Sequence, residues 1–404
     1  MNKLPLTKKE IINFFKKQKK IISNSETIDL KNAKGRILSQ DLKSKINLPP
    51  FNNSAVDGYA IIKKDLNSNK FLDCNRRVAA GDNKKIIIKS GEAVRVFTGA
   101  KMPVNSSTIV MQENVFLDEK KIRLLKVPRF GENFRLKGED IKKNQKILTK
   151  GTIINQKNLN LIAAVGIQKV KVFKKIKVGF FTSGNELRRP TNNLKNAEIN
   201  NSNFYALNSL LENKFIIKKY FGNLRDNFET VKNNILKVSK KYNVIITAGG
   251  ASVGEEDHLI NALSSLGTIY FWRAAIKPGR PIAVGKVNQC YIICLPGNPV
   301  SVQLLYAMLI KPLIEKLSGG VFKSPISSKI FANFSMKKKT NRMEWLRVTK
   351  QTINKKDFAN KYPKQGSGMI SSISYADGII EIGENISQIN KGDTFEFYNF
   401  ETLF

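Results

Sequence analysis

The sequence has little cysteine, a single histidine and no long hydrophobic run, and each shortage excludes a class of protein. Its three thiols, Cys74, Cys290 and Cys294, are too few and too irregularly spaced for a disulfide framework. A zinc site built on several histidines is excluded because His258 is the only histidine among 404 residues. No apolar run approaches the roughly 18 residues that span a bilayer, and residues 1–20 predict an amphipathic helix instead of a signal peptide. We therefore expect a cytoplasmic protein that does not engage a membrane.

Two of the cysteines occur in the segment CYIIC at 290–294, where the alternation of a strand would place both on one face. They could serve as metal ligands or as small buried hydrophobic side chains. We favour burial, because the chain offers no second Cys or His pair to complete a metal site.

Positive charge greatly exceeds negative charge. The chain has 69 Lys and Arg residues against 32 Asp and Glu, a formal net charge of +37 at pH 7. This balance is typical of nucleic-acid-binding proteins, but the lysines are spread along the chain and do not alternate with aromatic residues in an RNA-recognition pattern. An A/T-biased genome would give the same Lys- and Asn-rich composition, so we do not predict dedicated nucleic-acid binding. Attraction of small anionic substrates is a second interpretation.

The chain is long enough for two to four domains, and its pattern changes along its length. Residues 1–170 predict an N-terminal and linker region, with a module of short strands inserted at about 51–135. From 171 to 320 predicted strands alternate with predicted helices, the pattern of a mostly parallel sheet with right-handed crossovers. Residues 321–404 are again rich in short strands. The predicted fold class is α/β and multidomain, with β-rich N-terminal modules, a central α/β domain and a C-terminal β-barrel-like domain.

Three loops of similar composition follow predicted strands of the central domain. TSGNEL, TAGGASVGEED and LPGNPVS come after the strands at 178–181, 244–247 and 291–295. Ligands bind at the carboxyl ends of strands in open α/β sheets, and Gly-rich turns at helix starts bind oxyanions through exposed N–H groups. Gly and Asn also serve simply to end strands and begin helices. One such loop would favour that plainer interpretation, whereas three in one sheet favour a phosphate-bearing ligand.

Charged side chains occur in the same region. The carboxylates of Glu186, Asp226 and the run at 255–257 could hold Mg²⁺ beside a phosphate, because hard cations prefer oxygen ligands. They could equally be acidic residues favoured by helix dipoles. The segment IKPGRP at 276–281 adds two cations on a stiff turn, which suits an oxyanion but also an ordinary solvated turn.

A separate carboxylate, Asp57, lies in the segment NNSAVDGYA at 52–60, between a valine and a glycine. Turn chemistry accounts for the Asn, Asp and Gly residues of this segment. It leaves open whether Asp57 only shapes a turn or contacts a ligand.

Seven motifs stand in an order and spacing that resembles the MoeA family of molybdopterin molybdenumtransferases, to which the E domain of gephyrin also belongs. They are SAVDGYA, VFTGAKMP, GEDI, TSGNEL, TAGGASVGEEDH, KPGRP and LPGNPVS, and the resemblance covers essentially the whole chain. Small departures are TAGG where the family usually has TSGG, ASVG for VSVG and SAVDGYA for SAMDGYA. Ala248 therefore lacks a hydroxyl that the family usually offers at this position.

The resemblance implies an elongated, four-part subunit that forms a homodimer, with each active cleft shared between two chains. It implies Mg²⁺-dependent cleavage of adenylylated molybdopterin, insertion of molybdate into the dithiolene and release of AMP. Contact with the molybdopterin adenylyltransferase and with molybdoenzyme maturation proteins is a further expectation. The alternatives are a non-catalytic scaffold on the same fold, which the complete acidic set argues against, and the adenylyltransferase itself, which the N- and C-terminal modules argue against.

The resemblance also implies site residues, motif by motif. The expected catalytic residues are Asp57, Thr98, Asp140, Glu186, Asp226 and Asp257, of which the last three would also hold the metal. The expected substrate-binding residues are Thr182, Ser183, Gly184, Gly249, Gly250, Ser252, Gly254, Pro296, Gly297, Asn298 and Pro299. The expected molybdate ligands are Lys277, Pro278, Arg347 and Ser367. Asp57 and Thr98 would enter the cleft from the partner subunit.

Overall fold

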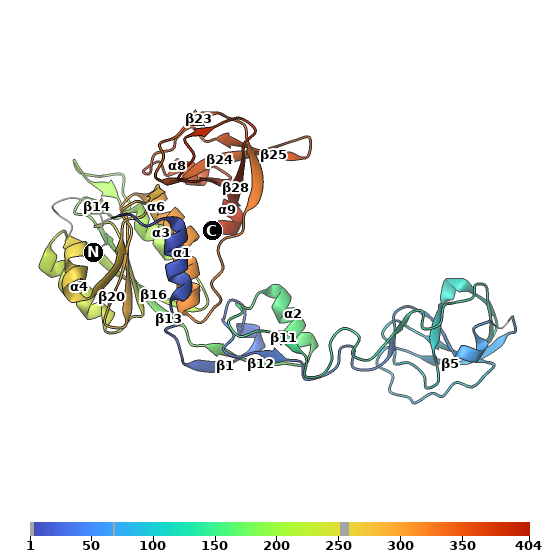
Figure 1. Ribbon diagram of the computed structural model, residues 1–404. Helices are drawn as coiled ribbons and strands as arrows, with labels where there is room; N and C mark the ends of the chain where they lie inside the picture. Colours follow the sequence, from blue (N-terminus) through green and yellow to red (C-terminus); the bar gives the residue numbers. More distant parts are fainter. Residues whose placement is uncertain (1–3, 68, 251–257) are drawn as a thin grey trace.

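The computed structural model describes residues 4–67, 69–250 and 258–404, which form an elongated subunit with a large lobe and a long arm (Figure 1). The lobe contains the central sheet, its helices and the C-terminal domain, and both ends of the chain lie in it. The arm begins with a small domain beside the lobe and ends in a separate β domain at its tip. The first half of the chain therefore reaches far from the domain that follows it.

The central domain contains a six-stranded sheet. Its strands are β13 (Ile176–Ser183), β16 (Ile216–Leu224), β17 (Val244–Ala248), β18 (Thr268–Trp272), β20 (Ala283–Val287) and β21 (Cys290–Leu295). They are arranged in the order β16-β13-β17-β21-β20-β18. The first four are parallel to one another, β20 pairs antiparallel with β21, and β18 pairs antiparallel with β20. Every residue of β17 and β21 is buried, because helices cover both faces of a parallel sheet. The predicted α/β class is confirmed.

Helices surround this sheet and connect its strands. They are α1 (Lys8–Lys17), α3 (Ser202–Leu210), α4 (Phe228–Ser239), α5 (His258–Leu266), α6 (Pro299–Leu305) and α7 (Lys311–Leu317). A π-helical turn at Tyr306–Ile310 joins α6 to α7. The side chains of Asn201 and Asn227 cap α3 and α4 by accepting from the backbone N–H groups of Phe204 and Thr230.

The two cysteines of β21 are fully buried, as we predicted for small hydrophobic side chains. Burial raises the pKa of the Cys290 thiol to about 12. This thiol is therefore protonated and unreactive at neutral pH.

Two domains form the arm. The one beside the lobe contains helix α2 (Gln156–Ala164) and two strand pairs, β1 (Ser25–Asp29) with β12 (Lys169–Phe173) and β2 (Leu42–Lys43) with β11 (Lys146–Leu148).

The domain at the tip has a six-stranded sheet in the order β7-β4-β6-β5-β9-β8. Its strands are β4 (Gly58–Ile61), β5 (Leu72–Val78), β6 (Glu92–Val96), β7 (Thr108–Met111), β8 (Val115–Asp118) and β9 (Lys121–Leu124). A short pair, β3 (Asn53–Ser54) with β10 (Phe134–Arg135), accompanies this sheet.

The C-terminal domain is a small barrel. Its sheet has the order β19-β24-β25-β22-β28-β26, and an additional β24–β26 pairing closes the last five strands into a ring. The strands are β19 (Ile276–Lys277), β22 (Ser328–Ala332), β24 (Met343–Ile353), β25 (Lys356–Lys361), β26 (Gly378–Ile382) and β28 (Thr394–Asn399). Because β19 belongs to the central part of the sequence, its parallel pairing with β24 connects the two domains of the lobe.

Short elements complete the lobe. They are the pair β14 (Leu187–Arg188) with β15 (Ile199–Asn200), the pair β23 (Met336–Lys337) with β27 (Gln388–Ile389), and the helices α8 (Ser371–Ser374) and α9 (Phe400–Leu403).

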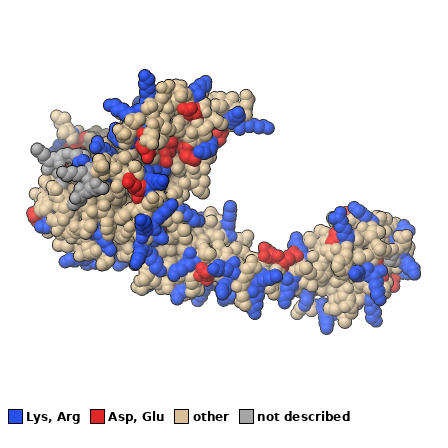
Figure 2. Space-filling model, viewed as in Figure 1, with Lys and Arg blue, Asp and Glu red and all other residues tan. Residues whose placement is uncertain are grey.

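Lysine and arginine side chains are scattered over both the lobe and the arm on the face shown in Figure 2. In the described part of the chain, no helix combines the length and the apolar composition needed to cross a membrane.

Candidate functional site

The carboxyl ends of β13, β17 and β21 lie side by side in the central sheet. These strands are parallel neighbours, and their register places Thr182 opposite Ala248 and Ala248 opposite Leu295. The three Gly-containing loops that we predicted to bind an oxyanion therefore leave the sheet at one edge. This edge is where open α/β sheets bind ligands.

The last two residues of β13 have different surroundings. Thr182 is fully buried, and its Oγ1 accepts from Asn201 Nδ2 at 2.9 Å and lies 2.8 Å from Tyr220 Oη. The side chain of Ser183 donates a hydrogen bond from Oγ to Asp226 Oδ1 at 3.2 Å. The hydroxyl of Thr182 thus holds neighbouring elements together, whereas Ser183 and Asp226 form the beginning of a polar site.

Glycine is required directly after Ser183. Gly184 has φ 144°, and a Cβ there would lie 2.5 and 2.6 Å from the two carboxylate oxygens of Glu186. The positive φ favours glycine at this position, and the exposed Glu186 carboxylate folds back against it. Two predicted metal ligands thus contact neighbouring residues, Glu186 at Gly184 and Asp226 at Ser183.

The loop after β17 approaches β13 just as closely. Gly249 has φ 105°, and a Cβ at this position would lie 2.3 Å from the backbone oxygen of Ser183. Gly250 has φ 70°, and its Cβ would be 3.2 Å from Ser183 Oγ. Both glycines therefore permit contact between the two strand ends. The remaining predicted residues of this loop, Ser252, Gly254 and Asp257, lie outside the described residues.

The third loop is fixed by a residue that the sequence did not single out. Asn203 of α3 is buried and donates from Nδ2 to the backbone oxygen of Gly297 at 2.7 Å. Asn298 occupies the N-cap position of α6 and Pro299 its first turn, and Pro296 is buried. Asn203 lies in the region of alternating predicted strands and helices at 171–320, and that pattern did not reveal its contact with Gly297.

The loops after β13 and β21 line a cleft of about 500 Å³ between the central and C-terminal domains. The central domain contributes Ser183, Glu186, Asn203 and the Gly297–Pro299 segment, and the C-terminal domain contributes Gly368 and Ile370. The predicted molybdate ligand Ser367 is adjacent, where its backbone oxygen accepts from Val300 N at 3.2 Å. Two domains therefore enclose one polar cleft.

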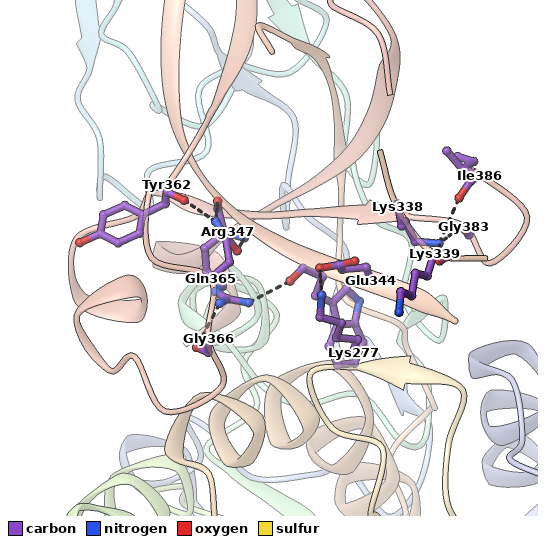
Figure 3. Close-up of polar contacts among 11 residues, drawn as sticks. Lys277, Lys338, Lys339, Glu344, Arg347, Tyr362, Gln365, Gly366, Gly383 and Ile386 are labelled. Carbon is purple, nitrogen blue, oxygen red and sulfur yellow. Dashed lines mark hydrogen bonds and ion pairs between the residues drawn. The ribbon is translucent and has the colours of Figure 1, made fainter. Parts of the chain in front are cut away.

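The predicted molybdate cations Lys277 and Arg347 gather around one buried carboxylate, Glu344 (Figure 3). Lys277 Nζ lies 2.8 Å from Glu344 Oε1, next to the buried Pro278. Arg347 is 2% exposed, and its guanidinium donates to Ser372 Oγ and to the backbone oxygens of Trp345 and Gly366 at 3.2–3.3 Å.

Burial lowers the pKa of Arg347 to about 10, while the negative charge of Glu344 opposes that shift. Arg347 is therefore cationic at neutral pH, and its guanidinium is hydrogen-bonded to the protein groups around it.

Asp57 and Thr98 contact each other in the tip domain of the arm. The Asp57 carboxylate accepts from Thr98 N at 2.7 Å and from Thr98 Oγ1 at 2.8 Å, and both residues are exposed. The Thr98 N–H and then its hydroxyl hold the pKa of Asp57 below its ordinary value, with a smaller contribution from Arg95. Asp140 is also exposed, and its backbone N–H donates to Leu48. Within one chain, Asp57 and Thr98 are at the opposite end of the molecule from the cleft (Figure 1).

The described residues contain no group of three or more His, Cys, Asp or Glu side chains placed to hold a metal ion. Glu186 and Asp226 are nevertheless two hard oxygen donors near the Ser183 hydroxyl. Mg²⁺ is commonly bound by one or two carboxylates together with substrate phosphates. The donor set that is described therefore fits Mg²⁺ bound jointly with a phosphate-bearing ligand.

Three family models match successive parts of the chain. Residues 6–166 match the MoeA N-terminal region (domains I and II), residues 179–316 a probable molybdopterin binding domain, and residues 329–400 the MoeA C-terminal region (domain IV).

Relatives match at full length. A molybdopterin molybdenumtransferase of Haemophilus influenzae is 32% identical over 94% of this chain and 95% of its own length. A putative molybdopterin biosynthesis protein of Methanocaldococcus jannaschii is 30% identical over 98% of both chains. The crystal structure of a molybdopterin biosynthesis MoeA protein from Pyrococcus horikoshii OT3 is 26% identical with a TM-score of 0.83, over 98% of this chain and 100% of that one.

Proposed function

The chain belongs to the MoeA family of molybdopterin molybdenumtransferases, enzymes of molybdenum cofactor biosynthesis, and from this membership we propose that it inserts molybdate into adenylylated molybdopterin with release of AMP. The observation that carries the proposal is that three loops leave the sheet at one edge, and that two of them, after β13 and β21, line one cleft between two domains while the third packs against Ser183. Backbone N–H groups and hydroxyls at such loops suit the phosphoanhydride of the adenylylated substrate.

The loops would bind and orient the pyrophosphate. Gly184, Gly249 and Gly250 have backbone angles that favour glycine, and Gly249 lies too close to the backbone oxygen of Ser183 for a side chain. The Asn203 contact holds the carbonyl of Gly297 and leaves Asn298 at the start of α6. A loop region held in this way loses little conformational freedom when the substrate binds.

The proposal includes a Mg²⁺ ion held by Glu186, Asp226 and, by resemblance, Asp257. When bound, Mg²⁺ would offset the negative charge of the phosphoanhydride and favour departure of AMP. Ser183 orients Asp226 through its hydroxyl, and Gly184 gives the Glu186 carboxylate room to approach. These contacts support the assignment of both carboxylates.

Molybdate would enter from the side of the C-terminal domain. A dianion and a pyrophosphate repel each other strongly at short range, so cations are needed between them. Lys277 lies at the contact between the two domains of the lobe, and Arg347 lies beside the segment that leads to Ser367. A homodimer in which Asp57 and Thr98 reach the partner's cleft completes the proposed site.

The family matches favour this reaction over the two alternatives. An adenylyltransferase made of the central domain alone would not require the matched N- and C-terminal regions. A scaffold without activity would not require Glu186 at the cleft or Asp226 bonded to Ser183, which lines it.

The test supplies purified protein with adenylylated molybdopterin, molybdate and Mg²⁺, and measures AMP and molybdenum cofactor. We expect both products in equal amounts, with AMP release dependent on molybdate. No turnover, or AMP release that is the same without molybdate, would contradict the proposal.

A further inference from the structure

Asp57 and Thr98 share their surface of the tip domain with an arginine to which the proposed reaction gives no role. Arg95 lies on β6, and the strand register places it directly opposite Tyr59 of β4. Gln112 connects Arg95 to Asp57, because its backbone N–H donates to the Asp57 carbonyl at 3.3 Å and its side-chain oxygen accepts from Arg95 Nη2. Arg95 therefore belongs to the same small surface as the Asp57–Thr98 contact.

The guanidinium of Arg95 is held in place by aromatic rings. Its central carbon lies 4.8 Å from the ring centroid of Tyr59 and 5.3 Å from that of Phe97. Arg95 is half-buried, and Tyr59 beneath it is buried. Contacts with ring faces and with the neutral amide of Gln112 orient the charge but do not neutralise it. A side chain held in this way loses little conformational freedom when it binds a ligand.

Within the described part of the chain, no carboxylate forms an ion pair with Arg95. The Asp57 carboxylate is close enough to interact with its charge but accepts its hydrogen bonds from Thr98. The neighbouring strand adds a second cation, because Arg77 of β5 lies opposite Arg95 in the register and is exposed. Like charges directly opposite each other destabilise a sheet. An anionic ligand is therefore the partner that this surface lacks.

A cation beside Asp57 also resolves a difficulty with charge. Thr98 holds the pKa of Asp57 below its ordinary value, so this carboxylate is ionised at neutral pH. Brought alone to a cleft that contains a phosphoanhydride and molybdate, it would be repelled by both. Arg95 offsets this repulsion, and the planar donors of a guanidinium match phosphate oxygens better than an ammonium does.

We propose that Arg95 binds the phosphoanhydride of the substrate in the cleft of the partner subunit, next to Asp57. The inference rests on the proposed function for the substrate and for the shared cleft. Arg95 would donate to phosphate oxygens through guanidinium N–H groups that it does not use for Gln112. It cannot reach the cleft of its own chain, because the tip domain and that cleft lie at opposite ends of the molecule (Figure 1).

The test is equilibrium dialysis of the purified full-length protein against ADP with Mg²⁺ at constant ionic strength. ADP is the probe because it joins adenosine to a pyrophosphate, as the adenylylated substrate does. Wild type is compared with Arg95→Met, which keeps an apolar stem between the rings and removes the charge.

Arg123→Met is the matched control. Arg123 lies on β9 of the same sheet, and its guanidinium also contacts two rings, those of Phe71 and Phe116, at 5.7 and 5.6 Å. Its neighbour Ile122 packs in the hydrophobic cluster that contains Tyr59, so alternation along the strand places Arg123 on the opposite face of the sheet. The control thus removes an equally clamped charge that does not adjoin Asp57.

We expect one ADP per chain in wild type and at least about tenfold weaker binding to Arg95→Met, because charge-assisted hydrogen bonds to phosphate are lost. Arg123→Met should stay within about twofold of wild type, because a distant exposed charge is screened. Arg95→Met should cause a similar loss in protein that already carries Asp57→Ala, because Arg95 contacts the phosphates directly. Asp226→Ala at the cleft should also weaken binding, and two distant residues can act on one ADP only if two chains form the site.

No ADP binding to wild type, an unchanged isotherm for Arg95→Met, or equal losses in both arginine variants would overturn the proposal. So would the absence of a further loss in the Asp57→Ala background, since Arg95 would then only position Asp57. Binding that is insensitive to Asp226→Ala would place ADP on the tip domain and overturn the proposal as well. If thermal unfolding shows that Arg95→Met is misfolded, Arg95→Gln is measured by the same criteria. Because the assay involves no turnover, its failure is distinguishable from failure of the proposed reaction.

Discussion

Single buried charges hold parts of the lobe together. The guanidinium of Arg347 is bonded to Ser372 and to the carbonyls of Trp345 and Gly366, which lie in different segments of the C-terminal domain. A buried acceptor that loses its donor retains the full cost of its desolvation. Arg347 therefore stabilises the fold whether or not it also contacts molybdate.

Arg347→Met should lower the free energy of unfolding by about 2–4 kcal/mol, because it removes three hydrogen bonds that the buried guanidinium donates to Ser372 and to the carbonyls of Trp345 and Gly366. Urea denaturation of the variant and the wild type measures the difference. Arg342→Met is the control, because Arg342 has no bonded partner among the described residues, and its effect should be within about 0.5 kcal/mol. Equal stability of the Arg347 variant and wild type would mean that these hydrogen bonds contribute nothing.

Asp57→Ala should abolish cofactor formation while leaving the melting temperature within about 2 °C of wild type, because the side chain is exposed. Asp118→Ala, an exposed carboxylate on β8 of the same sheet, should keep full activity. Loss of folding in the Asp57 variant would favour a purely structural turn.

The pH dependence of the Asp57 contact follows from its lowered pKa. The carboxylate accepts from Thr98 when ionised, so this contact is complete above the ordinary pKa of aspartate and is lost as the pH falls through the lowered value. The two residues came from separate sequence motifs, SAVDGYA and VFTGA, and no sequence pattern showed that one bonds the other. Such a contact depends on the pairing of β4 with β6, which brings segments 41 residues apart together.

At the scale of elements, the site depends on close approach between strand ends. The order of strands and helices in the central domain could be predicted from hydrophobic patterns, because buried parallel strands are nearly continuous apolar runs. The contacts of Gly249 and Asn203 could not, since they depend on how the ends of β17 and α3 meet β13 and the Gly297 loop. The barrel closure through β24 and β26 is likewise a long-range pairing that short strands do not specify.

Gly249→Ala should destabilise the protein by about 1–3 kcal/mol more than Gly222→Ala and should impair substrate binding. The two glycines have nearly equal φ, 105° and 103°, so both variants are strained at the backbone. Only at Gly249 would the new Cβ meet a backbone oxygen, that of Ser183, at 2.3 Å, whereas at Gly222 nothing lies within 4 Å. Urea unfolding of both variants measures the difference, and equal losses would show that the close approach is unimportant.

At the scale of the whole molecule, the arm separates Asp57 and Thr98 from the cleft of their own chain (Figure 1). Residues at both places can act together only if a second subunit supplies one of them. The +37 net charge is distributed over lobe and arm on the face shown, so it does not identify this second subunit or any other partner (Figure 2). Our proposal of a homodimer therefore rests on the distance between these two sets of site residues within one chain.

Mixing two inactive variants tests the shared cleft. Asp57→Ala and Glu186→Ala should each be inactive alone, because each lacks one half of every site. Unfolding and refolding them together at equal concentration should restore about one quarter of wild-type activity, since half of randomly formed dimers are mixed and each mixed dimer has one complete site. Mixing Glu186→Ala with Asp226→Ala is the control and should restore none, because both residues belong to the same half. Equal recovery in both mixtures would exclude the shared cleft.

The most direct test of the proposed function is a single-turnover reaction with adenylylated molybdopterin and Mg²⁺, performed with and without molybdate. AMP and molybdenum cofactor are both quantified in each reaction. We expect one AMP released for each cofactor formed, and AMP release that requires molybdate. AMP released at the same rate without molybdate, or no product with the wild-type protein, would contradict it.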